Sequence, residues 1–423
     1  MGPRGAATHA RHHLTVAAAH RTAPRCRWDN VSTDVLRVLV ACPGLDHVSR
    51  GYETFAAEAY RALKGREGLH VTLLKGSGPR SNGERRGWCL RRDGRVARSV
   101  QSILHRPYAD YEIEEITFTP ALYRAARRAD VVLLSDQLAA RALDALRRRL
   151  GGNFAVVLSI GAPYPGPFPY ADLVHQVSPA ALELSIERGE RPERMRLLPH
   201  AFETAGYSTP TGAAHLRSRL GLPAGRPLLI SVAALNNWHK RHRYLVSEVA
   251  ALGNDRPHLA LIGNVEPETE DLRAFAHEQL GAGVTIATVP AGEVSTWLAT
   301  SDLFVLASVT EAFGRAIGEA LLAGLPCILH DTSVMRFAAQ DHARYIDMEK
   351  PGALAAAIRA TLAIPLSPAV RAKRSRQTAA RLSWDALAGD YEDMLRDAAR
   401  MRSSARGSVE LHNSGARATT STT

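Results

Sequence analysis

Two glutamates on either side of a glycine-containing turn have a type and spacing that could bind and activate a ligand. Glu311 and Glu319 lie eight residues apart, and Gly314 stands between them, where a polar loop meets a helical stretch. Such a helix start, here from Phe313 through Arg315 to Ala316, has free backbone amides. These amides carry the positive end of the helix dipole and can hold phosphate. A carboxylate on each side of a bound pyrophosphate can accept hydrogen bonds from hydroxyls. The pattern therefore indicates a ligand with hydroxyls at both ends and a diphosphate in the middle, as in a nucleotide sugar.

The elements that must position this turn are a buried strand, a loop, a helix and a second buried strand. Leu303–Ala307 is a continuous apolar run, which is typical of a parallel strand covered on both faces. A helix is expected from Phe313 to Ala323, with Gly324 as its left-handed cap and Pro326 preventing its continuation. Cys327–Leu329 then enters the next strand.

A lysine follows an earlier strand in the same half of the chain. Leu228–Ala233 is expected to be a strand, and the loop after it carries Lys240 just before a helix that ends near Leu252. A lysine at a helix start opposes the helix dipole, so Lys240 indicates a bound anion rather than a contribution to stability.

The stretch EAFGRAIGE, from Glu311 to Glu319, lies in the frame SDLFVLAS…EALLAGLP and resembles the group 1, or family 4, retaining glycosyltransferases. Two glutamates at this spacing are common on solvated helices, so the surrounding strand–loop–helix–Gly-x-Pro–strand frame makes the match specific. The resemblance covers about Leu36 to Arg400 and is stronger in the second half. It implies the GT-B fold, an α/β architecture in which two Rossmann-like, doubly wound domains face a cleft.

The resemblance also implies roles for individual residues. Glu311 would hold hydroxyls of the transferred sugar, Glu319 the ribose, and Lys240 the diphosphate, and the backbone at Val289 and Pro290 would border the nucleobase. We therefore predict Glu311 and Lys240 as catalytic residues. The predicted donor site consists of Glu319, Arg241, Phe313, Gly314, Arg315, Ala316, Val289 and Pro290.

One position departs from the family pattern. The family has an arginine at the strand end before the lysine, and that position falls here at Ala234 or Leu235. Either Arg241 or Arg243 replaces it, or one cation suffices.

The first half of the chain opens as a doubly wound domain does. A buried strand, Leu36–Ala41, is followed by a loop and by a helix that ends near Leu63. No G-x-G-x-x-G is present, so no dinucleotide site is predicted. Arg50-Gly51 partly matches a Gly-Gly turn that faces the cleft in the family, although a plain tight turn is the alternative. Gly161 follows a strand and is expected at the same sheet edge.

Two histidines are further candidates for the acceptor side. Many relatives place a histidine near the transferring sugar, where this chain has Ser159-Ile160-Gly161. His175 is the nearest substitute, but the preferred interpretation is a core histidine. His200 follows Pro199 in a segment that resembles the family's Pro-x-Gly turn, and it faces the cleft only if that alignment holds. The predicted acceptor residues are Arg50, Gly51, Gly161, His175 and His200.

The predicted domain organisation has six parts. It comprises a disordered tail over 1–34, an N-terminal Rossmann-like acceptor domain over 35–205, a linker over 206–226, a C-terminal Rossmann-like donor domain over 227–383, a terminal helix over 384–400 that crosses back to the first domain, and a disordered tail over 401–423.

Composition limits the partners. The net charge of +11 in 423 residues favours anionic partners or reflects only genome composition. The Gly- and Arg-rich stretch Gly76–Val100 is expected to be a loop or hairpin that grips an anionic acceptor or lipid headgroups, or is simply solvated.

The four cysteines are expected to be buried free thiols in a reducing compartment. No run approaches the roughly 20 apolar residues of a membrane span, and no segment matches a signal peptide, so a cytoplasmic location is expected, allowing peripheral contact with the inner face of the membrane.

The resemblance thus implies an enzyme that moves a sugar from a UDP-, GDP- or ADP-linked donor to a hydroxyl of a glycan, lipid-linked or small-molecule acceptor. No D-x-D pair is present, so neither a metal ion nor a cofactor is predicted. Two alternatives stay open. One is a nucleotide-sugar epimerase or phosphorylase of the same fold. The other is a non-catalytic protein that binds anions through its basic surface, although no nucleic-acid motif is present.

Overall fold

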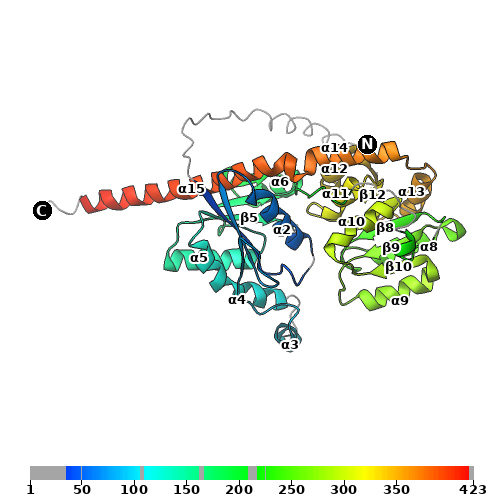
Figure 1. Cartoon of the computed structure of the whole chain (residues 1–423), viewed down its shortest axis with the longest axis horizontal. Coiled ribbons are helices and arrows are strands. Elements are labelled where there is room, and N and C mark those ends of the chain that lie inside the picture. The colour runs from blue at the N-terminus through cyan, green and yellow to red at the C-terminus, as the bar shows by residue number, and fades with distance from the viewer. Residues whose placement is uncertain are drawn as a thin grey trace, which may run out of the picture. The chain divides into compact units, whose positions relative to one another are not determined.

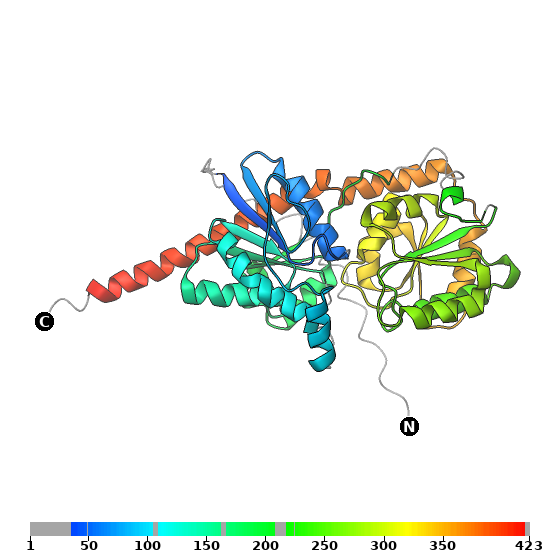
Figure 2. The same ribbon diagram turned by 60° about the horizontal axis from the view of Figure 1, so that its bottom comes forward.

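A computed structural model of the chain describes residues 35–48, 50–104, 109–161, 166–207, 217–223 and 225–418. The described residues from Leu36 onward form one compact unit. The predicted tail over 1–34, Cys26 and residues 208–216 and 224 of the predicted linker lie outside the described residues. The compact unit contains two parallel sheets, each with helices on its faces (Figures 1 and 2).

The first sheet has seven strands in the order β3-β2-β1-β4-β5-β6-β7. Its strands are β1 (Leu36–Cys42), β2 (Leu69–Lys75), β3 (Glu84–Arg86), β4 (Val131–Leu134), β5 (Ala155–Ile160), β6 (Leu173–Gln176) and β7 (Met195–Leu197). Its helices are α2 (Gly51–Lys64), α3 (Arg95–Leu104), α4 (Ala109–Ala126), α5 (Gln137–Leu150) and α6 (Pro179–Glu187), with a 3-10 turn at Pro192–Arg194. The strand order reverses between β1 and β4, and ligands bind at the carboxyl ends of strands at such a point.

The second sheet has six strands in the order β10-β9-β8-β11-β12-β13. Its strands are β8 (Leu228–Val232), β9 (His258–Ile262), β10 (Val284–Ala287), β11 (Leu303–Leu306), β12 (Cys327–His330) and β13 (Ala343–Ile346). Its helices are α8 (His242–Ala250), α9 (Thr269–Leu280), α10 (Ala291–Thr300), α11 (Arg315–Leu322), α12 (Ser333–Ala339) and α13 (Ala353–Leu362), with 3-10 turns at Gly253–Asp255, Gly281–Gly283 and Gln340–His342. Here the order reverses between β8 and β11, the strands that precede Lys240 and Glu311.

Successive residues of a strand pack in hydrophobic cores on opposite faces of the sheet. In β1, Val38 and Val40 pack in one buried cluster, and Leu39 and Ala41 pack in another. The second sheet is covered on both faces in the same way. This double coverage explains the continuous apolar runs in the sequence.

Two helices close the chain. Helix α14 (Pro368–Leu382) packs on α11, and α15 (Trp384–Ala418) places Trp384 and Tyr391 in the core of the first sheet. In Figure 1, α15 runs in orange and red beside α2. The sequence predicted that this helix would end near Arg400, but it continues to Ala418. No proline interrupts the added segment, so its polar composition alone does not end the helix.

Other predictions from the sequence concern local structure and can be compared with the described residues. The stretch Gly76–Val100 was expected to be a loop or hairpin, whereas it contains β3, which pairs in parallel with β2, and the first residues of α3. Of the cysteines that the structure describes, Cys42 and Cys327 are buried, Cys89 is half-buried, and all three are free thiols. No helix in the described ranges combines the length and the apolar character that crossing a bilayer requires.

Candidate functional site

A cavity of about 1020 Å³ lies between the carboxyl ends of strands from both sheets. Residues that follow β1, β4 and β5 form one wall, and residues that follow β8, β9, β10 and β11 form the other. The predicted site residues that line it are Glu311, Lys240, Glu319, Phe313, Gly314, Arg315, Ala316, Val289, Arg50, Gly51, Gly161 and His200.

Lys240 and Glu311 meet in this cavity. The Lys240 Nζ lies 2.5 Å from Glu311 Oε1, and the Ser308 hydroxyl donates to the same carboxylate at 2.6 Å. The turn that carries the lysine is fixed by Asn236, whose Oδ1 accepts from the Lys240 backbone N–H at 3.0 Å. His239 Nε2 donates to the Thr310 carbonyl at 2.8 Å and so ties the two loops together. The ammonium is therefore held beside the start of α11.

Gly314 shapes that helix start. Its φ of +74° is left-handed, and a Cβ there would lie 2.8 Å from Ile317 Cδ1. Glycine is required for both reasons. Helix α11 then begins at Arg315, and its first amides have no partner within the helix. Gly314, Arg315 and Ala316 line the same cavity as Lys240, as a phosphate site at this helix start requires.

Glu319 lies one helical turn further on and also lines the cavity. Within the described residues, its carboxyl has no hydrogen-bonded partner. Burial raises the pKa of Glu319, the nearby Arg315 guanidinium opposes that shift, and the Glu58 carboxylate adds to it. A half-buried carboxyl that is free to accept is suited to bind a pair of hydroxyls.

Arg315 lines the cavity, but its guanidinium is engaged elsewhere. Its Nη2 donates to both oxygens of Glu58 on α2, at 2.9 and 3.0 Å, and its Nη1 donates to the Ala201 carbonyl at 3.1 Å. The guanidinium also lies over the Phe202 ring, 4.3 Å from its centroid. The side chain therefore joins α11 to the first half of the chain, and only the backbone amide of Arg315 is left for a donor.

On the opposite wall, Arg50 and Gly51 stand at the start of α2. Arg50 Nη2 lies 3.0 Å from Glu266 Oε1, an ion pair with the segment after β9. Gly161 packs against the ring of Tyr52, because a Cβ at Gly161 would lie 2.5 Å from Tyr52 Cε1. All three predicted residues lie at the cavity, as expected of the carboxyl edge of a parallel sheet.

The two histidines differ. His200 lines the cavity and stacks on Phe313, with centroids 5.6 Å apart. Burial and the Arg315 charge hold the pKa of His200 well below its usual value, so the ring is neutral. His175 is fully buried, donates from Nε2 to the Leu198 carbonyl at 2.9 Å, and does not line the cavity. Burial lowers the pKa of His175 to about 4. It is a core histidine, which was the preferred interpretation.

One family model matches part of this sequence, and solved structures share its architecture. Residues 226–363 match the family model described as glycosyl transferases group 1. This segment is a group 1 glycosyltransferase domain. It contains β8 to β13 and every predicted donor residue. No curated protein sequence matches the chain significantly.

Solved structures confirm the GT-B fold for the chain as a whole. Sucrose-phosphate synthase from Thermosynechococcus elongatus has a TM-score of 0.69 at 19% identity, over 85% of this chain and 98% of that one. HepE from Anabaena, in complex with UDP and glucose, gives 0.66 at 16%, over 85% and 99%. The catalytic domain of starch synthase IV from Arabidopsis thaliana, bound to ADP and acarbose, gives 0.65 at 14%, over 87% and 100%.

Neither Arg241 nor Arg243 replaces the family arginine that is missing at Ala234 or Leu235. Arg241 caps α8 in a left-handed conformation, and its Nη1 donates to the Met348 carbonyl at 3.0 Å. Arg243 lies over the Phe275 ring at 4.7 Å. Neither side chain lines the cavity, so the structure places Arg241 outside the predicted donor site. Pro290 is also absent from the cavity wall, although its neighbour Val289 is present.

Sequence reasoning missed a set of carboxyl groups on the first wall. Glu53 on α2, Glu115 on α4 and Asp136 after β4 all line the cavity. Burial is the largest cause that raises the pKa of each carboxyl, and the pKa of Asp136 is raised well above its usual value. The position of Asp136 directly after a buried strand could have indicated it, because ligands bind at that edge.

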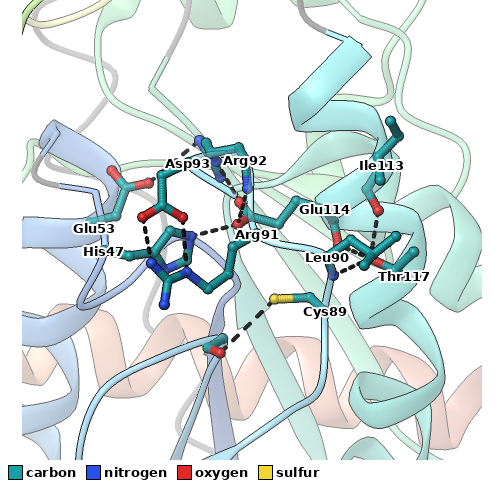
Figure 3. Close-up of polar contacts among 11 residues, drawn as sticks. His47, Glu53, Cys89, Leu90, Arg91, Arg92, Asp93, Ile113, Glu114 and Thr117 are labelled. Carbon is teal, nitrogen blue, oxygen red and sulfur yellow. Dashed lines mark hydrogen bonds and ion pairs between the residues drawn. The ribbon is translucent and has the colours of Figure 1, made fainter. Parts of the chain in front are cut away.

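Arg92 lies beside Glu53 and Glu114 (Figure 3). It was predicted to belong to a basic surface loop, but it is buried and its Nε donates to Glu114. Glu114 also contacts His47 Nε2 at 2.5 Å. The neighbouring Arg91 instead pairs with Asp93 at the surface. The basic stretch is thus divided between an internal network and solvent.

One group of described residues could hold a metal ion. His330, Asp347 and Glu349 offer ligand atoms within 4.8 Å of one another. They follow β12 and β13, the two carboxylates are exposed, and none of the three lines the cavity.

Proposed function

We propose that this chain is a retaining glycosyltransferase that needs no metal ion and moves a sugar from a nucleotide-sugar donor to an acceptor hydroxyl. The observation that carries the proposal is the cavity that Lys240, Glu311, Glu319 and the start of α11 line together. The UDP and ADP in solved structures of the same fold support a UDP- or ADP-linked donor, and GDP is the third candidate.

The donor would lie with its diphosphate on the amides that follow Gly314. Glu319 would accept from the ribose hydroxyls and Glu311 from hydroxyls of the sugar. Lys240 already touches Glu311, and in the complex its ammonium would also face the phosphate. Such preorganised charge stabilises the leaving diphosphate without reorganisation during the reaction. Because Arg241 and Arg243 lie away from the cavity, Lys240 and the helix start carry this task.

In the proposed step, the bond between the anomeric carbon and the phosphate oxygen breaks through an oxocarbenium-like state. The acceptor oxygen then bonds to the same face of that carbon, so the configuration is retained. The acceptor proton passes to the departing phosphate oxygen, and the electron pair of the broken bond remains on the diphosphate. No protein carboxylate needs to form a covalent intermediate, unlike in many retaining hydrolases.

The acceptor would bind against the first wall, near Arg50, Gly51, Gly161 and His200. Closure of the two walls would exclude water, which would otherwise hydrolyse the donor. We place the enzyme in the cytoplasm, in synthesis of a glycan, a glycolipid or a cell-envelope polysaccharide. The net charge of +11 supports a peripheral association with an anionic membrane surface.

A thermal-shift panel of UDP-, GDP- and ADP-sugars tests the donor site, since a ligand that binds only the native state raises the melting temperature. We expect one nucleotide series to stabilise the protein, with the same shift in EDTA. Glu319→Ala should remove that shift. With the donor identified, NMR of the product should show the donor's anomeric configuration. A product that forms without any acceptor would instead identify an epimerase, and the absence of stabilisation by all three series would refute the proposal.

A further inference from the structure

The wall that the first sheet contributes has more carboxyl groups than cations. Glu53, Glu115 and Asp136 line it. The charged groups that act most strongly on Asp136 are three carboxyls, Glu115, Glu53 and Glu114, and a single guanidinium, that of Arg92. This local balance is opposite in sign to the net charge of the chain.

Arg92 forms its hydrogen bonds outside this set of carboxyls. Its Nε and its backbone N–H both donate to Glu114, the latter at 3.1 Å, and its guanidinium lies over the Tyr111 ring at 3.9 Å. Its Nη1 forms an ion pair with Glu53 Oε1 at 3.9 Å, a distance too long for a hydrogen bond (Figure 3). The Arg92 guanidinium is therefore paired with Glu114, a carboxylate that does not line the cavity.

Other arginines of the cavity are also paired. Arg50 meets Glu266 at 3.0 Å, and Arg61 meets Glu203 at 2.5 Å. A phosphorylated or carboxylated acceptor would thus face carboxyls on this wall and find its cations already engaged. Like charges at short range oppose binding.

Glu53 is a buried carboxyl of this wall whose hydrogen bonding is incomplete. The residue is 4% exposed, and among the described residues its Oε2 has no hydrogen-bond partner. A buried oxygen without a donor costs free energy, so native structures rarely leave one unless a ligand or water completes it. Burial also raises the pKa of Glu53, Glu115 and Asp136, although the Arg92 charge opposes each shift and Glu115 Oε2 accepts from the Ala139 backbone N–H at 3.0 Å.

We propose that the acceptor is an amine-bearing sugar or cyclitol, whose ammonium group lies against Asp136, Glu115 and Glu53. The proposal rests on the glycosyltransferase function of the same cavity and adds the chemical class of its acceptor. The ammonium supplies three hydrogen-bond donors and the missing positive charge. Transfer still occurs to a hydroxyl, and the amine serves for recognition.

Three matched oligosaccharides test this on the full chain. They are the β-1,4-linked trimer of glucosamine, the same trimer with every amine acetylated, and cellotriose, which has hydroxyls in place of the amines. Calorimetric titration near neutral pH, with the preferred nucleoside diphosphate at saturation, should show that the amine trimer binds about 10-fold or more tightly than either partner. This factor corresponds to a hydrogen bond with a charged group.

Variants of the wall assign the preference to these carboxyls. Asp136→Asn and Glu115→Gln should each reduce the preference for the amine trimer several-fold, whereas Glu278→Gln, at an exposed position on α9, should leave it unchanged. Affinity for the nucleoside diphosphate, measured on each variant, shows that the fold and the donor site are intact.

An amine trimer that binds no more tightly than the acetylated trimer, or not at all, would overturn the proposal. So would an unchanged preference in both wall variants. If nucleotide binding persists in those cases, the glycosyltransferase function stands and only the acceptor class is wrong. If no nucleoside diphosphate binds the parent protein, the proposed function itself fails.

Discussion

Two glycines in helices should respond to the same substitution with opposite sign. Gly318 lies in α11 between Arg315 and Glu319, and a Cβ there would lie 2.4, 2.7 and 3.1 Å from three atoms of the Phe202 ring. Gly389 lies in α15, and a Cβ there would meet nothing within 4 Å. In an open helix position, Gly→Ala stabilises by about 0.8–1 kcal/mol.

At Gly318 the clash outweighs this propensity. Phe202 is 1% exposed and is held between the Arg315 guanidinium and Phe313, so its ring has no open space to enter. Overpacking in a core costs about 1–3 kcal/mol, and contact with three ring atoms points to the upper end of that range. After the gain in propensity, Gly318→Ala should destabilise by about 2 kcal/mol.

Differential scanning calorimetry gives the comparison. A change of 1 kcal/mol shifts the melting temperature of a domain of 150–250 residues by about 2–4 °C. Gly318→Ala should therefore melt about 4–8 °C lower and Gly389→Ala about 2–4 °C higher than the parent. Adding Phe202→Leu to Gly318→Ala makes room for the new methyl group and should recover part of the loss. A rise in melting temperature for Gly318→Ala that equals the rise for Gly389→Ala would refute the packing argument.

Three further predictions concern the charged groups of the cavity. Lys240→Ala should lower kcat by about 10²–10³-fold, the usual effect of removing one preorganised donor, with the melting temperature nearly unchanged; steady-state kinetics with near-parent kcat would contradict its role. Glu58→Gln leaves the buried Arg315 without its carboxylate and should cost about 3 kcal/mol, and adding Arg315→Met should restore part of it in denaturant unfolding; additive losses would exclude coupling of the pair. Asp136 faces Glu115, Glu53, Glu114 and Arg92, and its pKa is raised. The folded state therefore binds a proton at Asp136 more tightly than the unfolded state does. The free energy of unfolding consequently falls as pH rises from the unfolded pKa through the folded pKa. Asp136→Asn should remove this loss and raise the melting temperature more at pH above that window than below it; an equal shift at both pH values would contradict the assignment.

The second half of the chain could be predicted closely because one local frame sets it. The apolar run at Leu303, the left-handed Gly314 and Gly324, and the proline at 326 each act on neighbouring residues, so the strand, the helix and its ends follow from the sequence. The predicted pairing of Lys240 with this frame needed only the order of parallel strands, which brings the ends of β8 and β11 together.

Side-chain direction was harder to predict than position. Arg241 stands next to Lys240, yet its left-handed backbone turns the guanidinium to the Met348 carbonyl, away from the cavity. Nothing in the local spacing indicates φ > 0 at an arginine. The carboxyl wall was missed for a different reason. Glu53, Glu115 and Asp136 are separated by long stretches of sequence, and only the sheet topology and the packing of α2 and α4 gather them.

The wall also shows why net charge is a poor guide to a ligand. The excess of arginine in the sequence favours an anionic partner, but the buried arginines of the cavity are paired: Arg315 with Glu58, and Arg92 with Glu114. A carboxylate stabilises a guanidinium that is taken out of water, so these two buried pairs leave little positive charge free in the cavity. Carboxyls in excess of those pairs then set the sign of the field inside the cavity. On the opposite wall Lys240 contacts Glu311 beside the start of α11, so under the proposed function the donor diphosphate would meet this ammonium and the acceptor would meet the carboxyls of the first wall.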